Sequence, residues 1–301
     1  MSASFAIDFA AFPPLPPTMF GSPDGLSGGS SDEDRFSPAA EIADSSWPPR
    51  LALLAGGLAT RLRPLTTAIP KSLVQIAGEP FLAHQLRLIR AGGIREVILC
   101  CGYLGRQIAD FAGDGSRFGL SITYSFDGNR LLGTGGALRA ALPLLGRHFL
   151  VMYGDSWLTE PLQPIWRAFL DSQKPALMSV YRNENRWGAS NVDYRRGLIL
   201  RYDNHPCPAM HHIDYGLEAL SAGVLERWSM PEFDLSDVWS GLASHSLLAG
   251  YETSNRFYEI GSLSGLAEME AAVAATASLA VFPLTEGCPP PQRRARGVPS
   301  S

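Results

Sequence analysis

The residues with the clearest potential for chemistry lie between positions 53 and 73, in the run LLAGGLATRLRPLTTAIPKSL. A short apolar stretch ends there at Gly56 and Gly57, where the missing Cβ atoms let backbone N–H groups approach phosphate oxygens closely. Arg61 and Lys71 follow in the same run. A guanidinium and an ammonium group on either side of a triphosphate can neutralise charge that develops on the α-phosphate and on departing pyrophosphate. The combined spacing predicts a site for phosphoryl chemistry.

The chain uses lysine only twice, at Lys71 and Lys174, and arginine for every other fixed positive charge. A lysine at position 71 therefore stands where this chemistry needs a compact ammonium group rather than a planar guanidinium. Lys174 lies beside Pro175 in a segment typical of a surface turn. Its presence means that retention of a lysine is not by itself an argument for function.

These residues need strands and helices to position them, and the chain has the pattern of both. Four short runs are typical of strands: 51–55, 96–101, 120–126 and 148–155. Three segments between them have the pattern of helices: 80–91, 104–112 and 134–145. This alternation predicts an α/β fold, a doubly wound three-layer sandwich with a mostly parallel (mixed) central sheet. In such sheets ligands bind beyond the carboxyl ends of the strands.

The second half is less regular and predicts a more antiparallel layer that faces the substrate. Its expected strands are 176–181, 190–194, 197–202 and 211–220, and its expected helices are 221–228, 234–243 and 262–274. Residues 1–48 are rich in Pro, Gly, Ser and Asp and cannot bury enough apolar surface to offset their ordering entropy. We therefore expect a disordered leader over 1–48, a folded catalytic domain over 49–283 and a disordered tail over 284–301.

The run over residues 53–73 resembles the signature of the sugar nucleotidyltransferase (NDP-sugar pyrophosphorylase) family. That signature is a Gly-rich turn, Thr-Arg-Leu, Pro-x-Thr and then Pro-Lys, and all four parts are present here. The resemblance implies that Gly56, Gly57, Arg61 and Lys71 hold and activate a nucleotide. One departure is Ala59, where the family commonly has a third glycine; alanine costs little there unless the residue has a positive φ.

The resemblance continues through LLGTGGALRAAL (131–142), VMYGDSWL (151–158) and FYEIGSLSGL (257–266). It implies nucleotide contacts from Leu54, Gly56, Gly57, Gly102, Gly133, Thr134 and Gly135. It further implies that Asp155 and Glu259 bind Mg²⁺, which prefers one or two carboxylates and several waters. Glu259 stands where the family has an aspartate. The catalytic residues are then expected to be Arg61, Lys71 and Asp155.

On the sugar side, RWGASNV (186–192) and HHIDYGLEAL (211–220) are similar to the segments that line the family's sugar pocket. They point to Asn191, Asp214 and Tyr215. Many members carry Glu-Lys-Pro between these segments, with the lysine on the sugar phosphate, whereas this chain has Asp203-Asn204-His205-Pro206. The motifs GYLGRQI, LGTGGA and FYEIG most resemble the heptose-1-phosphate and mannose-1-phosphate guanylyltransferase branch.

Composition excludes several other classes. A formal net charge of −4 over 301 residues argues against a surface that coats nucleic acid. No apolar run reaches the ~20 residues of a membrane helix, and no basic residue precedes Arg35, as a signal peptide would need. We expect a cytoplasmic protein whose partners are a nucleoside triphosphate and a sugar 1-phosphate. We expect no nucleic-acid or membrane partner, and a homo-oligomer is possible.

The function expected from these features is nucleotidyl transfer from a nucleoside triphosphate to a sugar 1-phosphate, for the synthesis of glycan precursors. Guanylyl transfer is favoured and uridylyl transfer comes next. The missing Glu-Lys-Pro lysine keeps open a non-catalytic nucleotide-sugar sensor or regulatory subunit. A glycosyltransferase of related architecture is a further alternative, although GDSW (154–157) lacks the second aspartate of an Asp-x-Asp motif. An NAD-dependent dehydrogenase is disfavoured because the turn lacks G-x-G-x-x-G spacing.

Overall fold

The computed structural model describes residues 47–205 and 207–279. The expected tail (284–301) and all but the last two residues of the expected leader (1–48) lie outside these ranges. Pro48 is exposed, whereas Trp47 packs against one of the hydrophobic clusters. Of the expected leader, Trp47 therefore belongs to the packed part of the chain.

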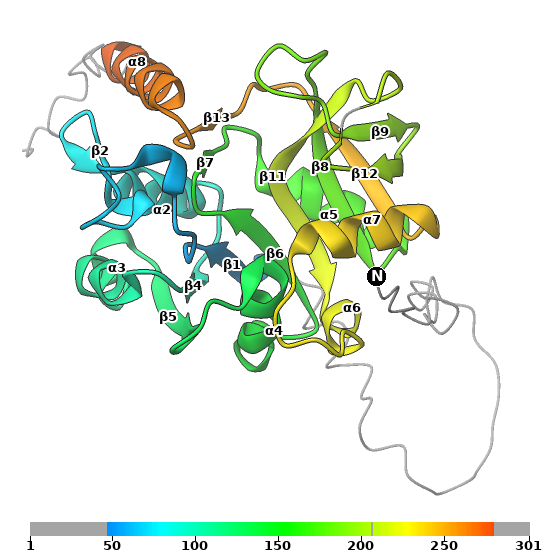
Figure 1. Cartoon of the computed structure of the whole chain (residues 1–301), viewed down its shortest axis with the longest axis horizontal. Helices are drawn as coiled ribbons and strands as arrows, with labels where there is room; N and C mark the ends of the chain where they lie inside the picture. Colours follow the sequence, from blue (N-terminus) through cyan, green and yellow to red (C-terminus); the bar gives the residue numbers. More distant parts are fainter. Residues whose placement is uncertain (1–46, 206, 280–301) are drawn as a thin grey trace, which may run out of the picture.

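The core of the molecule is one nine-stranded sheet in the order β5-β4-β1-β6-β11-β8-β12-β10-β9 (Figure 1). The strands are β1 (Leu51–Leu54), β4 (Glu96–Cys101), β5 (Ser121–Phe126), β6 (His148–Tyr153), β8 (Ala176–Arg182), β9 (Val192–Arg195), β10 (Leu198–Tyr202), β11 (His212–Ser221) and β12 (Leu248–Thr253). Two of them, β10 and β11, run opposite to the other seven. The sheet is therefore mixed but mostly parallel, as predicted.

The first four strands in the sheet order, β5, β4, β1 and β6, are all parallel to one another. Leu51–Leu54 is buried along its whole length, since it lies between β4 and β6 with helices on both faces. A fully apolar strand is what such a position requires. Because the four strands share a direction, the loops after residues 54, 101, 126 and 153 leave the sheet at one edge.

β11 changes this pattern, because it lies antiparallel between β6 and β8. Its pairing with β8 is irregular between Asp214 and Glu218, and Gly216 in that stretch has a φ of 89°. The first residues of β11 therefore lie at the same edge of the sheet as the carboxyl ends of the parallel strands.

Helices cover both faces of the sheet and complete the three predicted layers. One hydrophobic cluster contains α4 (Gly133–Leu145), α6 (Ala222–Glu226) and α7 (Leu235–Ser244). The other contains α2 (Phe81–Ala91), α3 (Gly105–Ala112) and α5 (Leu162–Ser172). Within residues 47–205 and 207–279, every helix is too short or too polar to span a lipid bilayer.

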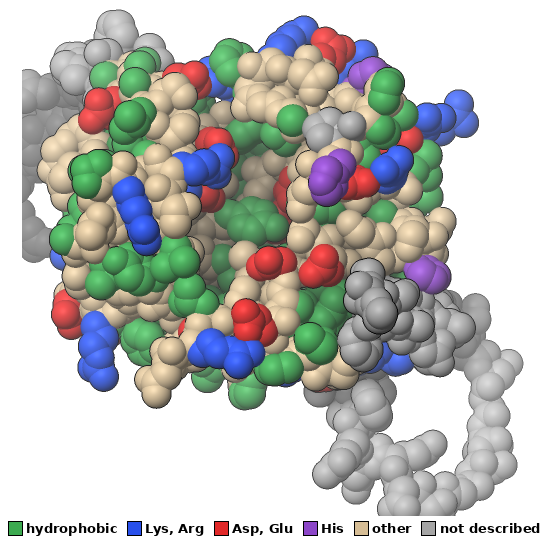
Figure 2. Space-filling model, viewed as in Figure 1, with side chains coloured by type: hydrophobic (Ala, Val, Ile, Leu, Met, Phe, Trp, Pro, Cys, Tyr) green, Lys and Arg blue, Asp and Glu red, His purple; other side chains and the backbone are tan. Residues whose placement is uncertain are grey.

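Short elements lie outside the nine-stranded sheet, most of them at its carboxyl edge. They are the 3-10 helices η2 (Thr60–Leu62), η3 (Lys71–Leu73) and η4 (Ser116–Phe118), the ribbon of β2 (Gln75–Ile76) and β3 (Glu79–Pro80), the ribbon of β7 (Ser156–Trp157) and β13 (Tyr258–Glu259), and α8 (Leu263–Leu279). A small cluster that includes Phe81, Ile260 and Met269 holds α8 against α2 and the β13 segment. A hollow with acidic and basic side chains at its rim opens in this region (Figure 2).

Candidate active site

A cavity of about 480 Å³ lies beyond the carboxyl ends of β1 and β6. It brings together most of the residues that the sequence assigned to nucleotide, metal and catalysis. Those that line it are Leu54, Gly56, Gly57, Arg61, Lys71, Gly133, Thr134 and Asp155. Gly102 and Gly135 support the wall without lining it.

The two glycines after β1 have different roles in the structure. A Cβ on Gly56 would lie 2.8 Å from the backbone nitrogen of Gly102, and Tyr103 donates its N–H to the Gly56 carbonyl at 3.1 Å. Gly56 therefore lacks a side chain because the next loop packs against it. Gly57 has no atom within 4 Å of its notional Cβ and is exposed to the cavity. Of the pair, only Gly57 has open space for a phosphate group.

Ala59, where the family commonly has glycine, adopts a left-handed conformation with φ 48° and ψ 45°. This is the positive-φ case in which alanine is strained relative to glycine, by ~1–2 kcal/mol. The turn is held by the Ala59 carbonyl, which accepts hydrogen bonds from the Thr66 hydroxyl at 2.8 Å and the Leu62 N–H at 3.1 Å. These contacts fix the start of η2, which carries Arg61 into the cavity wall.

Lys71 and Asp155 meet in the cavity wall, with the Lys71 Nζ atom 2.5 Å from Asp155 Oδ2. Lys71 begins η3 directly after Pro70, and Asp155 follows β6 through Gly154. Their side chains are only 17% and 32% exposed, so the ion pair is screened less than a surface pair. A Cβ on Gly154 would lie 2.4 Å from the Leu54 carbonyl, so this glycine lets β6 end close to β1.

Glu259 joins this pair through the small ribbon of β7 and β13, in which Glu259 is paired with Ser156. Ile260 also donates its N–H to the Asp155 carbonyl at 3.0 Å. Burial and the negative charge of Asp155 raise the pKa of Glu259, while Lys71 and Arg61 lower it. Two carboxylates thus converge on the ammonium of Lys71, an arrangement that a divalent cation would stabilise. No group of three or more candidate metal ligands occurs in the part of the chain that the structure describes.

The glycines at the start of α4 pack against the segment before α7. Gly133 has a φ of 74°, and a Cβ there would lie 2.4 Å from the Phe233 carbonyl. That carbonyl accepts the N–H groups of Gly135 and Gly136 at 3.0 and 3.1 Å. The backbone N–H of Gly135 is therefore already bonded within the protein.

Two carboxylates that sequence reasoning missed also line the cavity. Asp234 accepts hydrogen bonds from the Thr134 N–H at 3.0 Å and the Thr134 hydroxyl at 3.2 Å. Asp127 follows β5, its Oδ2 accepts the Leu132 N–H at 3.3 Å, and burial raises its pKa. The sequence signal for Asp127 was its place directly after a predicted strand, whereas Asp234 depends on a contact across 100 residues.

The residues assigned to the sugar lie directly before β9 and within β11. Asn191 accepts the Asp214 N–H on its Oδ1 atom at 3.0 Å, so these two predicted residues are neighbours. Tyr215 points away from them, because its ring is 1% exposed and packs edge-on against Phe257. The sugar contacts of all three remain predictions. His205, in the stretch that replaces Glu-Lys-Pro, has a side chain that is 97% exposed.

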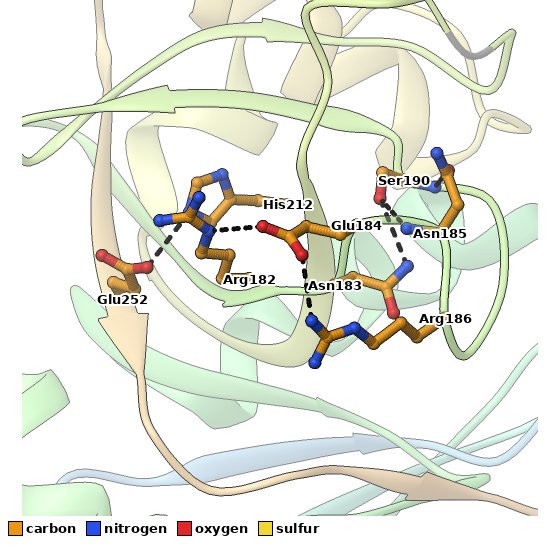
Figure 3. A network of polar contacts seen from close by, with 8 residues as sticks. All are labelled: Arg182, Asn183, Glu184, Asn185, Arg186, Ser190, His212 and Glu252. Atoms are coloured by element: carbon orange, nitrogen blue, oxygen red, sulfur yellow. Dashed lines mark hydrogen bonds and ion pairs between the residues drawn. The ribbon is translucent and has the colours of Figure 1, made fainter.

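A polar network holds the loop between β8 and β9 that leads to Asn191 (Figure 3). The buried Asn183 donates to the Gly188 carbonyl and the Ser190 hydroxyl, and Ser190 donates its N–H to Asn185. Beside it lie the ion pairs of Glu184 with Arg182 and Arg186, and a contact of His212 with Glu252. Trp187 in this loop stacks on Arg256, whose guanidinium carbon lies 3.2 Å from the ring centroid. The loop is thereby fixed to the segment that leads to Glu259.

A model of the nucleotidyl transferase family matches residues 52–201. The chain is 43% identical over 104 residues to the N-acetylmuramate alpha-1-phosphate uridylyltransferase of Neisseria meningitidis, covering 34% of this chain and 45% of the relative. It is 29% identical over 181 residues to the D-glycero-alpha-D-manno-heptose 1-phosphate guanylyltransferase of Campylobacter jejuni, covering 60% of this chain and 79% of the relative. The crystal structure of HddC from Yersinia pseudotuberculosis superposes with a TM-score of 0.64 at 21% identity, covering 75% of this chain and 99% of that chain.

The structural likeness bears on the fold alone, and it confirms the predicted α/β sandwich. The chain spans about half the length, or less, of several curated relatives that it matches. The share is 45% for the Neisseria enzyme and 40% for a glucose-1-phosphate thymidylyltransferase of Streptomyces antibioticus. The relatives differ in the nucleotide that their names state, which includes uridylyl, thymidylyl and guanylyl groups.

Proposed function

Because this chain belongs to the nucleotidyl transferase family, whose model matches residues 52–201, we propose that it transfers a nucleotidyl group from a nucleoside triphosphate to a sugar 1-phosphate. The observation that carries the proposal is the meeting of Lys71 and Asp155 at 2.5 Å in the wall of the cavity. Arg61 lines the same cavity and forms no ion pair within residues 47–205 and 207–279. It is therefore available to a phosphate.

In the proposed reaction, an oxygen of the sugar 1-phosphate attacks the α-phosphorus in line with the leaving pyrophosphate. A new P–O bond forms, and the bond from the α-phosphorus to the bridging oxygen breaks, with its electron pair leaving on pyrophosphate. The attacking phosphate is already ionised at neutral pH, so no general base is needed. Catalysis then consists of positioning and charge stabilisation. Lys71 and Arg61 would stabilise the negative charge on the α-phosphate and the departing pyrophosphate.

Asp155 and Glu259 fit Mg²⁺, because they are two carboxylates whose mutual repulsion contributes to the raised pKa of Glu259. When bound there, the ion would neutralise charge on the α-phosphate. The ribbon of β7 and β13, with the hydrogen bond from the Ile260 N–H to the Asp155 carbonyl, would keep the two carboxylates opposite each other.

We further propose that the nucleotide is a guanine nucleotide, and Asp127 supports this choice. Its carboxylate can only accept hydrogen bonds when ionised, and it lines the cavity at the end of β5. The Watson–Crick edge of guanine offers it two adjacent donors, N1–H and the N2 amino group. Uracil and thymine offer one N–H between two carbonyl oxygens, which a carboxylate repels. Adenine and cytosine each offer only an amino group there.

Pyrophosphate release with Mg²⁺ tests the proposal, with four nucleoside triphosphates screened against mannose, glucose and heptose 1-phosphates. We expect release with GTP and one matched sugar. An Asp127→Asn variant should lose preference for GTP on the order of tenfold, since an amide can face uracil as well as guanine. A folded protein that binds nucleotide but releases no pyrophosphate with any pair would contradict the transferase and favour the sensor.

A further inference from the structure

Two carboxyl groups lie close together in β11: Asp214, which the sequence assigned to the sugar, and Glu218, which has no role in the site described so far. Asp214 is partly exposed near the start of the strand, and Glu218 is 0% exposed four residues later. The strand is irregular between them, around Gly216, and both carboxyl groups raise the pKa of the same two tyrosines, Tyr153 and Tyr202. They are therefore neighbours on the face of the sheet that α4 and α7 cover.

The groups around this pair carry no compensating positive charge. Tyr153 from β6 and Tyr202 from β10 face it, and burial together with the two carboxyl groups raises the pKa of each phenol. From α7, Trp239 donates its indole N–H to the Tyr153 hydroxyl at 3.4 Å. No lysine, arginine or histidine of the described chain is among the groups that shift the pKa of Asp214 or Glu218.

An ionised carboxylate buried without a cation is strongly unfavourable, so the pair has to hold a proton. Burial and the nearby Asp214 raise the pKa of Glu218 well above its usual range. Burial raises the pKa of Asp214 as well, although a hydrogen bond with Glu218 and one from the Gly216 N–H at 2.9 Å offset part of that rise, whereas the effect of Asp214 on Glu218 adds to the rise there. Both Glu218 oxygens are buried and accept no hydrogen bond from any donor among the described residues, and Asp214 is the one carboxyl group beside them that acts on the pKa of Glu218. The proton therefore belongs on Glu218 and the negative charge on Asp214.

Asp214 lies next to the nucleotide cavity, on the side of the site that this cavity does not cover. The cavity extends over the ends of β1, β4 and β6, and β11 is the next strand beyond β6 in the sheet order. A Cβ on Gly216 would lie 2.9 Å from the Ser156 hydroxyl, which itself bonds Asp155 at 3.4 Å. If the phosphate of a sugar 1-phosphate lies at Asp155 and its sugar points away from the nucleotide, the sugar therefore extends over the start of β11.

We propose that Glu218 is a positioning residue that keeps a buried proton in a hydrogen bond to Asp214, so that Asp214 presents a fixed negative charge to the sugar. The inference rests on the proposed function and deepens it. A fixed carboxylate accepts hydrogen bonds from sugar hydroxyl or amino groups. It repels a sugar that carries a carboxylate of its own, such as a hexuronic acid, because the two charges face each other in a partly buried wall. The substrate is then a neutral or amino sugar 1-phosphate.

The proton on Glu218 is tested directly by infrared spectroscopy of the full-length protein at neutral pH. We expect the carbonyl stretch of a protonated carboxyl group, which shifts in D₂O and is absent from a Glu218→Gln variant. A Glu226→Gln variant is the matched control, since Glu226 is an exposed glutamate at the end of α6 and its loss should leave the band unchanged. Absence of the band from the wild type, or its survival in Glu218→Gln, would overturn the proposal whether or not the protein catalyses transfer.

The effect on the sugar is tested by comparing Glu218→Gln with Glu218→Leu. The amide of Gln keeps a donor for Asp214, so its KM for the sugar 1-phosphate should stay within about threefold of the wild type. Leu removes the donor, so the KM for the sugar 1-phosphate should rise on the order of tenfold, with a smaller change in kcat. The rise in KM should be larger at acidic pH, where Asp214 becomes protonated. Equal KM values in both variants, or equal use of neutral and carboxylated sugar phosphates by the wild type, would contradict it. A silent wild-type enzyme would refute the proposed function, while the infrared band still decides the proton.

Discussion

The ammonium nitrogen of Lys71 lies 2.5 Å from Asp155 Oδ2, although 84 positions separate the two residues in the chain. The contact joins the loop after β1 to the end of β6, and Glu259 adds a second carboxylate beside it. Without a substrate, the positive and negative groups of the site therefore neutralise one another. A triphosphate and its cation would replace these internal partners, since phosphate pairs with Lys71 and the cation pairs with Asp155.

Replacement of Lys71 by Ala should lower kcat on the order of 10²–10³-fold, because a positioned charge is lost where negative charge develops. Lys174→Ala is the matched control: this lysine donates to the Ser246 carbonyl at 2.9 Å and lies outside the cavity. Pyrophosphate release by the two variants makes the comparison, with circular dichroism to confirm that both are folded. Near-normal turnover by Lys71→Ala would remove Lys71 from the mechanism.

The two glycines after β1 should respond differently to alanine. Gly56→Ala forces a Cβ to 2.8 Å from the backbone of Gly102, and we expect a loss of roughly 1–3 kcal/mol in the free energy of unfolding. Gly57→Ala has open space, so its thermal midpoint should match the wild type while its KM for the nucleoside triphosphate rises. Thermal unfolding and kinetics of the pair check this. A stable Gly56→Ala protein would mean that the close approach to Gly102 is easily relaxed.

The metal assignment predicts that chelation abolishes transfer and that Mg²⁺ restores it. Glu259→Gln should raise the Mg²⁺ concentration for half-maximal activity on the order of tenfold, since even residues that only support metal ligands change affinity by that amount. Glu226→Gln offers a control, since this exposed glutamate lies at the end of α6. An unchanged Mg²⁺ requirement in Glu259→Gln would assign the second ligand to another residue.

The fold was largely predictable because its buried strands are apolar and its turns are marked by glycine. The sequence pattern did not identify α5, whose Pro161 and Pro164 resemble a loop. Both prolines lie at its start, where a missing N–H costs nothing, and the buried Leu162, Ile165 and Phe169 have helical spacing. β12 was missed as well. It contains Gly250, whose absent side chain makes room for the ring of Tyr194.

The candidate site was predictable where its residues follow one another in the chain, as from Gly56 to Lys71. The other residues of the site are brought together by contacts between segments that are far apart in the sequence. Asp234 reaches Thr134 only because α4 and α7 pack together on one face of the sheet. Glu218 stands within a predicted strand, but a single glutamate between apolar residues does not reveal which carboxyl group will be its neighbour. That neighbour depends on the irregular pairing of β11 with β8.

The buried proton of Glu218 also has a consequence for stability. In the unfolded chain this carboxyl group ionises near its usual pKa of 4.5, whereas in the folded protein its pKa is raised well above that value. Between the two values the folded state binds more protons than the unfolded state, so the free energy of unfolding falls as the pH rises. Glutamine does not titrate. Glu218→Gln should therefore be more stable than the wild type at pH 8, and the difference in thermal midpoint should shrink toward pH 5. Thermal melts of both proteins across this pH range measure the effect, with Glu226→Gln as the control. If the thermal midpoints of the wild type and Glu218→Gln differ by the same amount at every pH, Glu218 does not change its protonation on unfolding.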